Sequence, residues 1–189
     1  MNDAPGDDSA LFIAYAQGDL QAFERLYRRH RSALYRYLVR QCRDRELAND
    51  LFQAVWEKVI AQRQRYEPRA KFQTYLYTVA YNCFVDHCRR SAARPHPTVT
   101  ADAELDVPAR PADAPERQAE ASELRRRIDA AVAALPAEQR DAFLLYEESG
   151  LSVEQIGAIM GVGAETAKSR LRYAVAKLRV SLAEIEQLT

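Results

Sequence analysis

The spacing of apolar residues predicts α-helices over most of the chain. Between residues 19 and 90, apolar side chains recur every three or four positions, which places them on one face of a helix. Asp19 and Asp44 each precede such a run and are suited to cap it, because a carboxylate accepts hydrogen bonds from the first free N–H groups. A shorter helix, capped by Asp8 or Ser9, is expected ahead of Gly18. The longer helices of this half are expected over residues 19–42, 44–63 and 71–90.

The last third of the chain continues in shorter helical segments. One helix is expected over residues 122–135, and Pro136 suits the first turn of the next, which Gly150 ends. Ser152 and Gln155 then have the spacing of a capping box, in which the two residues cap each other and open a helix. The high content of Ala, Leu, Arg and Glu also favours helix over sheet.

A tight turn and a basic helix follow this capped helix. Gly161 and Gly163 frame the turn, and the basic helix covers residues 164–179. Two short helices around a glycine-containing turn match a helix-turn-helix, whose second helix enters the major groove of DNA. The alternative is an ordinary amphipathic helix with a solvated basic side.

The apolar side of the basic helix indicates which of its side chains face outward. Ala167, Leu171, Ala174, Val175 and Leu178 fall on the side that must face a core. Lys168 and Arg172 then point away from the core and can donate to guanine acceptors, while Arg170 is expected to contact phosphate or to stay solvated. The residues predicted to contact DNA on this helix are Thr166, Lys168, Ser169, Arg170, Arg172 and Tyr173.

The helix expected over residues 71–90 is rich in tyrosine. Its apolar stripe is formed by Phe72, Leu76, Val79, Ala80, Cys83 and His87. Tyr75, Tyr81, Asn82 and Arg89 fall on the other side, where exposed rings, amides and guanidinium groups suit unstacked bases. The alternative is a tyrosine-rich packing face. His87 is expected to be a core histidine.

The segment between the two helical halves has no helical or strand period. Five of the eight prolines lie within residues 94–115, which predicts a flexible linker. A long ordered loop is less favoured, because structureless loops of this length are rare in compact domains. We therefore expect an all-α chain with two small, separately folded helical domains, residues 1–93 and 120–189, joined by a flexible linker over residues 94–119.

Charge is unevenly distributed along the 189 residues, although the formal net charge is zero. Residues 1–94 hold 16 Lys or Arg and 11 Asp or Glu, whereas residues 95–120 hold 2 and 6. The neutral total therefore does not exclude a polyanionic partner, but it argues against charge-driven binding by the whole surface.

The sequence lacks the signals of secretion and of common catalytic chemistry. Three cysteines, an acidic N-terminus and the lack of an apolar run of about 18–20 residues predict a cytoplasmic protein with reduced thiols and no membrane insertion. Cys83, His87 and Cys88 do not have a zinc-site spacing, and no paired carboxylates or phosphate loop occur. We expect no metal, no cofactor, no catalytic residue and no small-molecule substrate.

Four segments, taken in order, resemble a known family. They are "GDLQAFERLYRRH", "ELANDLFQAVWEKVI", "KFQTYLYTVAYNCFVDHCRR" and "LPAEQRDAFLLYEESGLSVEQIGAIMGVGAETAKSRLRYAVAKLR". Arranged around a proline-rich linker, they are similar to bacterial RNA polymerase sigma factors of the extracytoplasmic-function group of the sigma-70 family. The resemblance implies a region 2 helical bundle, followed by a region 4 helix-turn-helix.

The resemblance also implies partners and roles. A sigma factor binds core RNA polymerase through the β′ clamp helices and the β flap, reads the −35 and −10 promoter elements and stabilises the melted strand. It further implies an anti-sigma factor as a partner. By position, the polymerase contacts would be Asp50, Gln53 and Trp56. The resemblance places Phe72, Tyr75, Asn82, Asp86, Arg89 and Arg90 on the −10 segment, and Tyr81 joins the predicted −10 residues from the exposed side of the helix. The −35 residues fall on the basic helix, at Lys168, Ser169, Arg172 and Tyr173.

Two other classes of protein remain as alternatives. A free-standing helix-turn-helix regulator would bind duplex DNA alone, usually as a symmetric dimer. The sequence shows no coiled-coil seam for such a dimer, and its first 90 residues would have no role in it. An enzyme is disfavoured because no constellation of catalytic residues occurs at a useful spacing.

Overall fold

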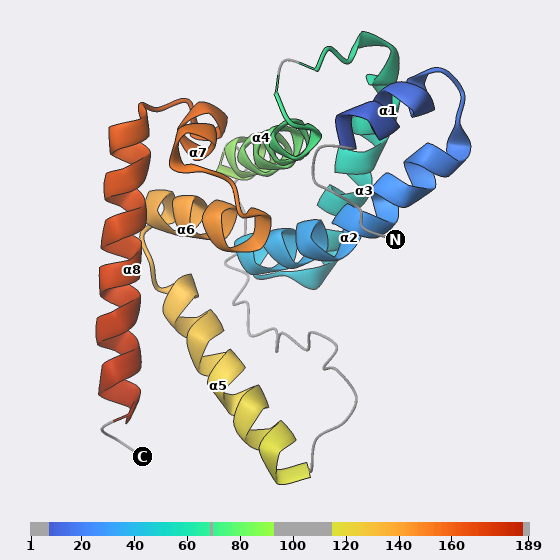
Figure 1. The fold of residues 1–189 in the computed structure, drawn as a ribbon. Helices are drawn as coiled ribbons and strands as arrows, with labels where there is room; N and C mark the ends of the chain where they lie inside the picture. Colours follow the sequence, from blue (N-terminus) through green and yellow to red (C-terminus); the bar gives the residue numbers. More distant parts are fainter. Residues whose placement is uncertain (1–7, 69, 93–114, 187–189) are drawn as a thin grey trace.

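The computed structural model describes residues 8–68, 70–92 and 115–186, and this part of the chain folds as eight α-helices and one 3₁₀ helix, without strands (Figure 1). The prediction of an all-α fold is confirmed. The helices are α1 (Asp8–Ala16), α2 (Leu20–Cys42), α3 (Arg45–Ala61), η1 (Arg63–Arg65), α4 (Phe72–Ala92), α5 (Pro115–Ala133), α6 (Ala137–Ser149), α7 (Val153–Met160) and α8 (Ala164–Glu186).

Aspartate caps fix the starts of α2 and α3, as the sequence predicts. The Asp19 carboxylate accepts hydrogen bonds from the N–H groups of Gln21 and Ala22 at 2.9 and 3.1 Å. Asp44 caps α3 in the same way, and each such cap stabilises its helix by about 1 kcal/mol. Between the two helices, Arg43 takes a left-handed conformation with φ 58°, so the chain reverses within two residues.

Asp8 is not the helix cap that the sequence suggests. It lies in the first turn of α1 with a buried side chain, and its carboxylate accepts hydrogen bonds from Arg29 and from His30 Nε2, the latter at 2.9 Å. Burial opposes ionisation of Asp8, but His30 and Arg29 outweigh it and lower the pKa of this carboxyl. The ion cluster therefore attaches α1 to α2.

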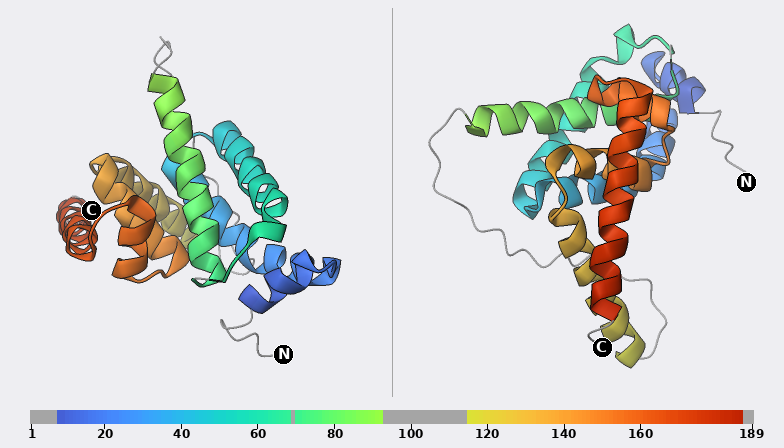
Figure 2. Two further views of the ribbon diagram at one scale, coloured as in Figure 1. Left: turned by 90° about the horizontal axis from the view of Figure 1, so that it is seen from above. Right: turned by 90° about the vertical axis from the view of Figure 1, so that its left-hand side faces the viewer.

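Helix α4 is buried on two faces, not one. Its predicted apolar stripe packs towards α2 and α3, with Phe72, Leu76, Ala80 and Cys83 all buried. Tyr77 is buried too, because α6 and α7 cover another side of the same helix. Figure 2 shows α4 running between α3 on one side and α6 and α7 on the other.

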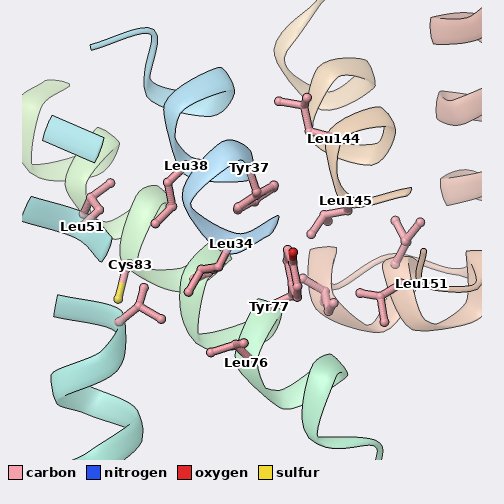
Figure 3. Close-up of a cluster of buried hydrophobic side chains, with 14 of the residues drawn as sticks. Leu34, Tyr37, Leu38, Leu51, Leu76, Tyr77, Cys83, Leu144, Leu145 and Leu151 are labelled. Atoms are coloured by element: carbon pink, nitrogen blue, oxygen red, sulfur yellow. The ribbon is translucent and has the colours of Figure 1, made fainter. Parts of the chain in front are cut away.

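The two helical halves of the chain share one continuous core. Tyr37 of α2 and Tyr77 of α4 lie next to Leu145 of α6 and Leu151 at the start of the turn into α7 (Figure 3). All four side chains are at most 2% exposed. Two helical units are present as predicted, but they are docked on each other, whereas the sequence led us to expect separately folded domains.

The expected linker falls largely outside the described residues. Residues 94–114 of the predicted linker, 94–119, are not among them. Helix α5 begins at Pro115, so the backbone of residues 115–119 is helical and the helix starts seven residues before the expected Ser122. The proposed domain limits, 1–93 and 120–189, stay predictions.

Candidate nucleic-acid interface

Helices α7 and α8 form a helix-turn-helix whose local geometry follows from the sequence. Ser152 Oγ accepts a hydrogen bond from the backbone N–H of Gln155 at 3.3 Å, and the side-chain oxygen Oε1 of Gln155 accepts one from the backbone N–H of Ser152 at 2.9 Å. The predicted capping box is therefore confirmed. Gly161 ends α7 at φ 68°, a left-handed conformation that glycine adopts without strain.

A glycine that sequence reasoning did not single out lets α8 approach α7 closely. A Cβ atom at Gly157 would lie 2.9 Å from the backbone oxygen of Val162 and 3.4 Å from the backbone nitrogen of Ala164. The Gly157 carbonyl also accepts a hydrogen bond from the N–H of Val162 at 2.9 Å. A glycine inside an otherwise apolar helix could have indicated this contact.

The outer face of α8 carries most of the predicted DNA-contacting residues. Ala167 and Ala174 are buried on the inner side, as predicted. The exposed predicted residues are Thr166, Lys168, Arg172 and Tyr173, and Ser169 is half-buried. The Arg172 guanidinium lies 5.1 Å from the ring centroid of Tyr173, so the two side chains form one cation–π pair on this face.

Arg170 is not on the open face of α8. It is half-buried, and its guanidinium is 2.8 Å from the carboxylate of Glu138 on α6. Arg170 is therefore not solvated in this conformation, and its contact with a phosphate stays a prediction. Its position reflects packing of α8 against α6, which a helical wheel of α8 alone cannot supply.

Helix α4 presents one exposed polar stripe. Asn82, Asp86, Arg89 and Arg90 are all exposed, and at 3.6 residues per turn they lie along one side of the helix. Arg90 Nε donates to the backbone oxygen of Asp86 at 3.2 Å, which leaves the rest of its guanidinium facing outward. Tyr75 lies two turns before Asn82, at the end of the same stripe.

Tyr75 lines a cavity of about 420 Å³ at the start of α4. The other lining residues are Gln62, Arg65, Tyr66 and Glu67. The Tyr75 hydroxyl donates to Gln62 Oε1 at 3.1 Å, and the rings of Tyr66 and Tyr75 are edge to face with centroids 5.2 Å apart. Burial, with a smaller effect of Tyr66, raises the pKa of Tyr75, so its hydroxyl remains a hydrogen-bond donor at neutral pH.

Sequence reasoning singled out Tyr75 but missed the other residues that line the cavity. Tyr75 is half-buried and not exposed as expected. Its partners come from the segment between α3 and α4, "QRQRYEPR", whose mixture of bases and an aromatic residue is the signal that could have found them. Helix α1 packs against Tyr66 of this cavity. The rings of Phe12 and Tyr66 are edge to face with centroids 4.8 Å apart, and Ser9 Oγ lies 3.2 Å from the Tyr66 hydroxyl.

Tyr81 does not belong to the exposed stripe. It is half-buried and faces α6, where burial first and then the Asp141 carboxylate raise the pKa of its hydroxyl. The prediction that this ring is exposed is wrong for this conformation. Tyr81 projects from a different side of α4 than Tyr75 and Asn82, so it does not lie on the stripe.

The predicted polymerase contacts divide into surface and core residues. Asp50 and Gln53 are exposed on α3, one turn apart. Trp56 is only 5% exposed and packs between the rings of Phe23 and Tyr27, with centroids 5.8 and 5.0 Å away. In this conformation Trp56 holds α3 against α2 and is not itself available to a partner.

His87 is not the core histidine that the sequence predicts. It is half-buried near the end of α4, and its Nε2 lies 3.1 Å from Ser91 Oγ of the same helix. Within the described residues, no three His, Cys, Asp or Glu side chains lie close enough together to hold a metal ion. None of the described helices has the length and apolar character needed to span a membrane.

Comparison with known proteins identifies both halves of the chain. Residues 26–94 match the family model of sigma-70 region 2, and residues 125–178 match that of sigma-70 region 4. The RNA polymerase sigma factor CarQ of Myxococcus xanthus is 36% identical over 172 residues, which cover 91% of this chain and 95% of that relative. The chain belongs to the sigma-70 family.

The relatives also give the group within the family. The ECF RNA polymerase sigma factor SigE of Mycolicibacterium smegmatis is 32% identical to this sigma factor over 96% of the chain and 66% of the relative. The chain is an ECF sigma factor, which directs transcription from promoters, and it is not a free-standing regulator. The predicted family, function and helix-turn-helix are thereby confirmed.

Solved structures share the fold. CnrH, solved in complex with the cytosolic domain of CnrY, aligns with a TM-score of 0.68 at 21% identity over 94% of this chain and 97% of that chain. The sigma factor RpoE of Bartonella quintana, solved with the anti-sigma factor NepR, aligns with a TM-score of 0.71 at 23% identity. The alignment covers 87% of this chain and 98% of that chain.

Proposed function

We propose that this sigma factor reads the −35 element with the outer face of α8. The observation that carries the proposal is the arrangement of Lys168, Arg172 and Tyr173, which are exposed on the side opposite the buried Ala167 and Ala174. Arg172 presents a planar guanidinium fork that can bind both guanine acceptors in the major groove. Thr166 and Ser169 flank this fork, and they are small enough for the helix to approach the bases closely.

The −10 element is read by α4 and the segment before it. Asn82, Asp86, Arg89 and Arg90 line the exposed stripe, which ends at the Tyr75 cavity. A cavity with two tyrosine rings, an amide and charged groups suits one unstacked base, whose face meets a ring and whose edge meets polar atoms. Binding a base there offsets part of the cost of melting the duplex, so no covalent chemistry is needed.

Core RNA polymerase binds α3 through Asp50 and Gln53. Both side chains are exposed on the same face, and Trp56 beneath them fixes their helix in the bundle. The β flap is the proposed partner of the second half. An anti-sigma factor is a further proposed partner, because the sigma factor RpoE of Bartonella quintana, which has a similar fold, was solved with the anti-sigma factor NepR. We place all these contacts in the cytoplasm.

A transcription assay with purified core polymerase tests the −35 proposal. We expect Arg172→Ala to reduce initiation only at promoters whose −35 sequence has the base that Arg172 contacts. The loss there should correspond to about 1–3 kcal/mol. Arg179→Ala is the matched control, because Arg179 is exposed further along α8. An equal loss on every −35 sequence would make Arg172 a phosphate contact, and tight duplex binding by the chain without polymerase would contradict the proposal.

A further inference from the structure

Helix α1 lies against the segment between α3 and α4 that forms one wall of the Tyr75 cavity. It contacts η1, α2 and α4, and Figure 1 shows it beside the turn that follows α3. This helix, Asp8–Ala16, precedes residues 26–94, the part of the chain that matches sigma-70 region 2. The role of α1 must therefore be inferred from its own contacts.

The buried side of α1 packs on both tyrosine rings of the cavity. Phe12 is fully buried, and its ring is edge to face with the ring of Tyr66, with centroids 4.8 Å apart. The Phe12 ring also lies 4.9 Å from the ring of Phe72 and 6.1 Å from that of Tyr75, at tilted angles. These separations lie in the range that aromatic pairs prefer. Phe12 therefore contacts both cavity tyrosines from the side of the core.

Polar side chains attach the same wall to α1 at both ends of the helix. In the first turn, Ser9 Oγ lies 3.2 Å from the Tyr66 hydroxyl. At the other end, Gln64 Nε2 donates to the backbone oxygen of the last residue of α1 at 2.8 Å, and the Arg63 guanidinium lies 5.8 Å from the ring centroid of Tyr15. The wall is therefore held along the whole length of α1.

Helix α1 is in turn anchored to α2 by the buried charges of Asp8, Arg29 and His30. The Asp8 carboxylate accepts hydrogen bonds from Arg29 and from His30 Nε2, and the side chains of Asp8 and His30 are at most 10% exposed. Such a buried pair is screened little by salt. Because α2 belongs to the packed core, this cluster connects the cavity wall through α1 to the rigid part of the bundle.

The wall itself has little regular structure to hold its shape. Its one helical element, η1, is a 3₁₀ helix of three residues, Arg63–Arg65, and none of the three is buried. Short 3₁₀ helices have poorer hydrogen-bond geometry than α-helices. A cavity that receives a base binds it more tightly when its side chains are already ordered, because ordering them on binding lowers the affinity. Contacts with α1 supply that order.

We propose that α1 is a positioning element for the cavity that holds an unstacked −10 base. Phe12 and Ser9 fix Tyr66 beside Tyr75, so that the two rings are in place before the base arrives. Both are positioning residues, since they act on the base only through the tyrosines and do not touch DNA. The proposal rests on the promoter-reading function proposed above and extends it to a helix outside the DNA-contacting surface.

The first test measures the coupling between α1 and the base in the cavity. Holoenzyme made from the full chain and core polymerase is bound to single-stranded −10 oligonucleotides, each with one abasic nucleotide. At the position that enters the cavity, the abasic change should weaken binding by about ten-fold, and Tyr75→Ala should abolish that difference. Phe12→Leu should reduce the difference to about three-fold or less at this position alone.

Ile13→Ala is the matched control, because Ile13 is the exposed neighbour of Phe12 on α1, and it should leave every abasic effect unchanged. An equal weakening at all positions in Phe12→Leu, or an unchanged difference at the cavity position, would overturn the proposal. If no position depends on Tyr75, the base-holding function of the cavity fails and the proposal fails with it. A position that depends on Tyr75 but not on Phe12 overturns the role of α1 alone.

The second test needs no DNA. Amide hydrogen exchange of the full chain should become about ten-fold faster in residues 62–67 of Phe12→Leu, while α3 and α4 stay as protected as in the unaltered chain. Unchanged exchange in residues 62–67 would overturn the proposal. If exchange rises throughout the first half, the variant has lost its fold, and Ser9→Ala decides instead. It should speed exchange in residues 62–67 only, and Ser9→Thr, which keeps the hydroxyl, should restore the natural rate; equal rates in the two Ser9 variants would overturn the proposal.

Discussion

At the scale of single residues, Asp141 shows how the interface constrains a charge. Its carboxylate accepts a hydrogen bond from Gln41 Nε2 and has Arg140 and Arg170 nearby, yet burial dominates and raises its pKa. A carboxyl with a raised pKa binds its proton more readily in the folded, docked protein than in the unfolded chain. The folded form therefore loses stability as pH rises from the ordinary aspartate pKa through the raised one.

Replacing Asp141 with Asn should accordingly stabilise the protein at neutral pH. The amide oxygen keeps an acceptor for Gln41 and removes the cost of a buried charge, so we expect a gain of about 1 kcal/mol, or roughly 2–4 °C in Tm for a chain of this size. Thermal melts from pH 3 to pH 8 should show the gain vanish below about pH 4, where the natural carboxyl is protonated. An equal gain at every pH, or a loss at pH 7, would contradict this account.

At the scale of helices, α4 shows what its sequence pattern predicts and where it fails. The apolar stripe of α4 and the caps of α2, α3 and α7 were predictable, because they depend on residues close together in the sequence. Tyr77 and Tyr81 were not, because their surroundings come from α6, more than 50 residues later along the chain. A helical wheel gives the faces of a helix but not the number of its faces that will be covered.

Gly157 offers a test of the helix-turn-helix at the same scale. Ala at this position would gain about 1 kcal/mol in helix propensity but would place a Cβ 2.9 Å from the backbone oxygen of Val162, and such overpacking costs about 1–3 kcal/mol. We expect a net loss of stability and weaker use of the −35 element, because α8 is displaced. Gly163→Ala is the control, since a Cβ there meets nothing within 4 Å. Equal Tm values for the two variants would show that α7 and α8 separate easily.

At the scale of the whole molecule, the two halves were predictable and their docking was not. The helix-turn-helix face of Lys168 and Arg172 follows from the local sequence, as does the tyrosine-rich helix. Docking depends on pairs such as Arg36 with Glu148, which are 112 residues apart in the chain. No local pattern marks these residues as partners, since a charged residue on a helix is more often solvated.

The shared core predicts that the two halves unfold together until the Glu148 ion pairs are removed. Trp56, the only tryptophan, reports on the first half alone, whereas helical circular dichroism reports on both. In urea, the two signals should give one coincident transition for the unaltered chain. Glu148→Gln removes the buried carboxylate that pairs with the largely buried Arg40 and with the more exposed Arg36, while Arg40 keeps its ion pair with Asp129. We expect this to cost about 3 kcal/mol of docking. Circular dichroism should then show two transitions, of which only one coincides with Trp56 fluorescence. The matched control Glu147→Gln changes the exposed neighbour on the same helix and should keep one transition. A single coincident transition in Glu148→Gln would mean that apolar contacts such as Tyr77 with Leu145 suffice to hold the halves together.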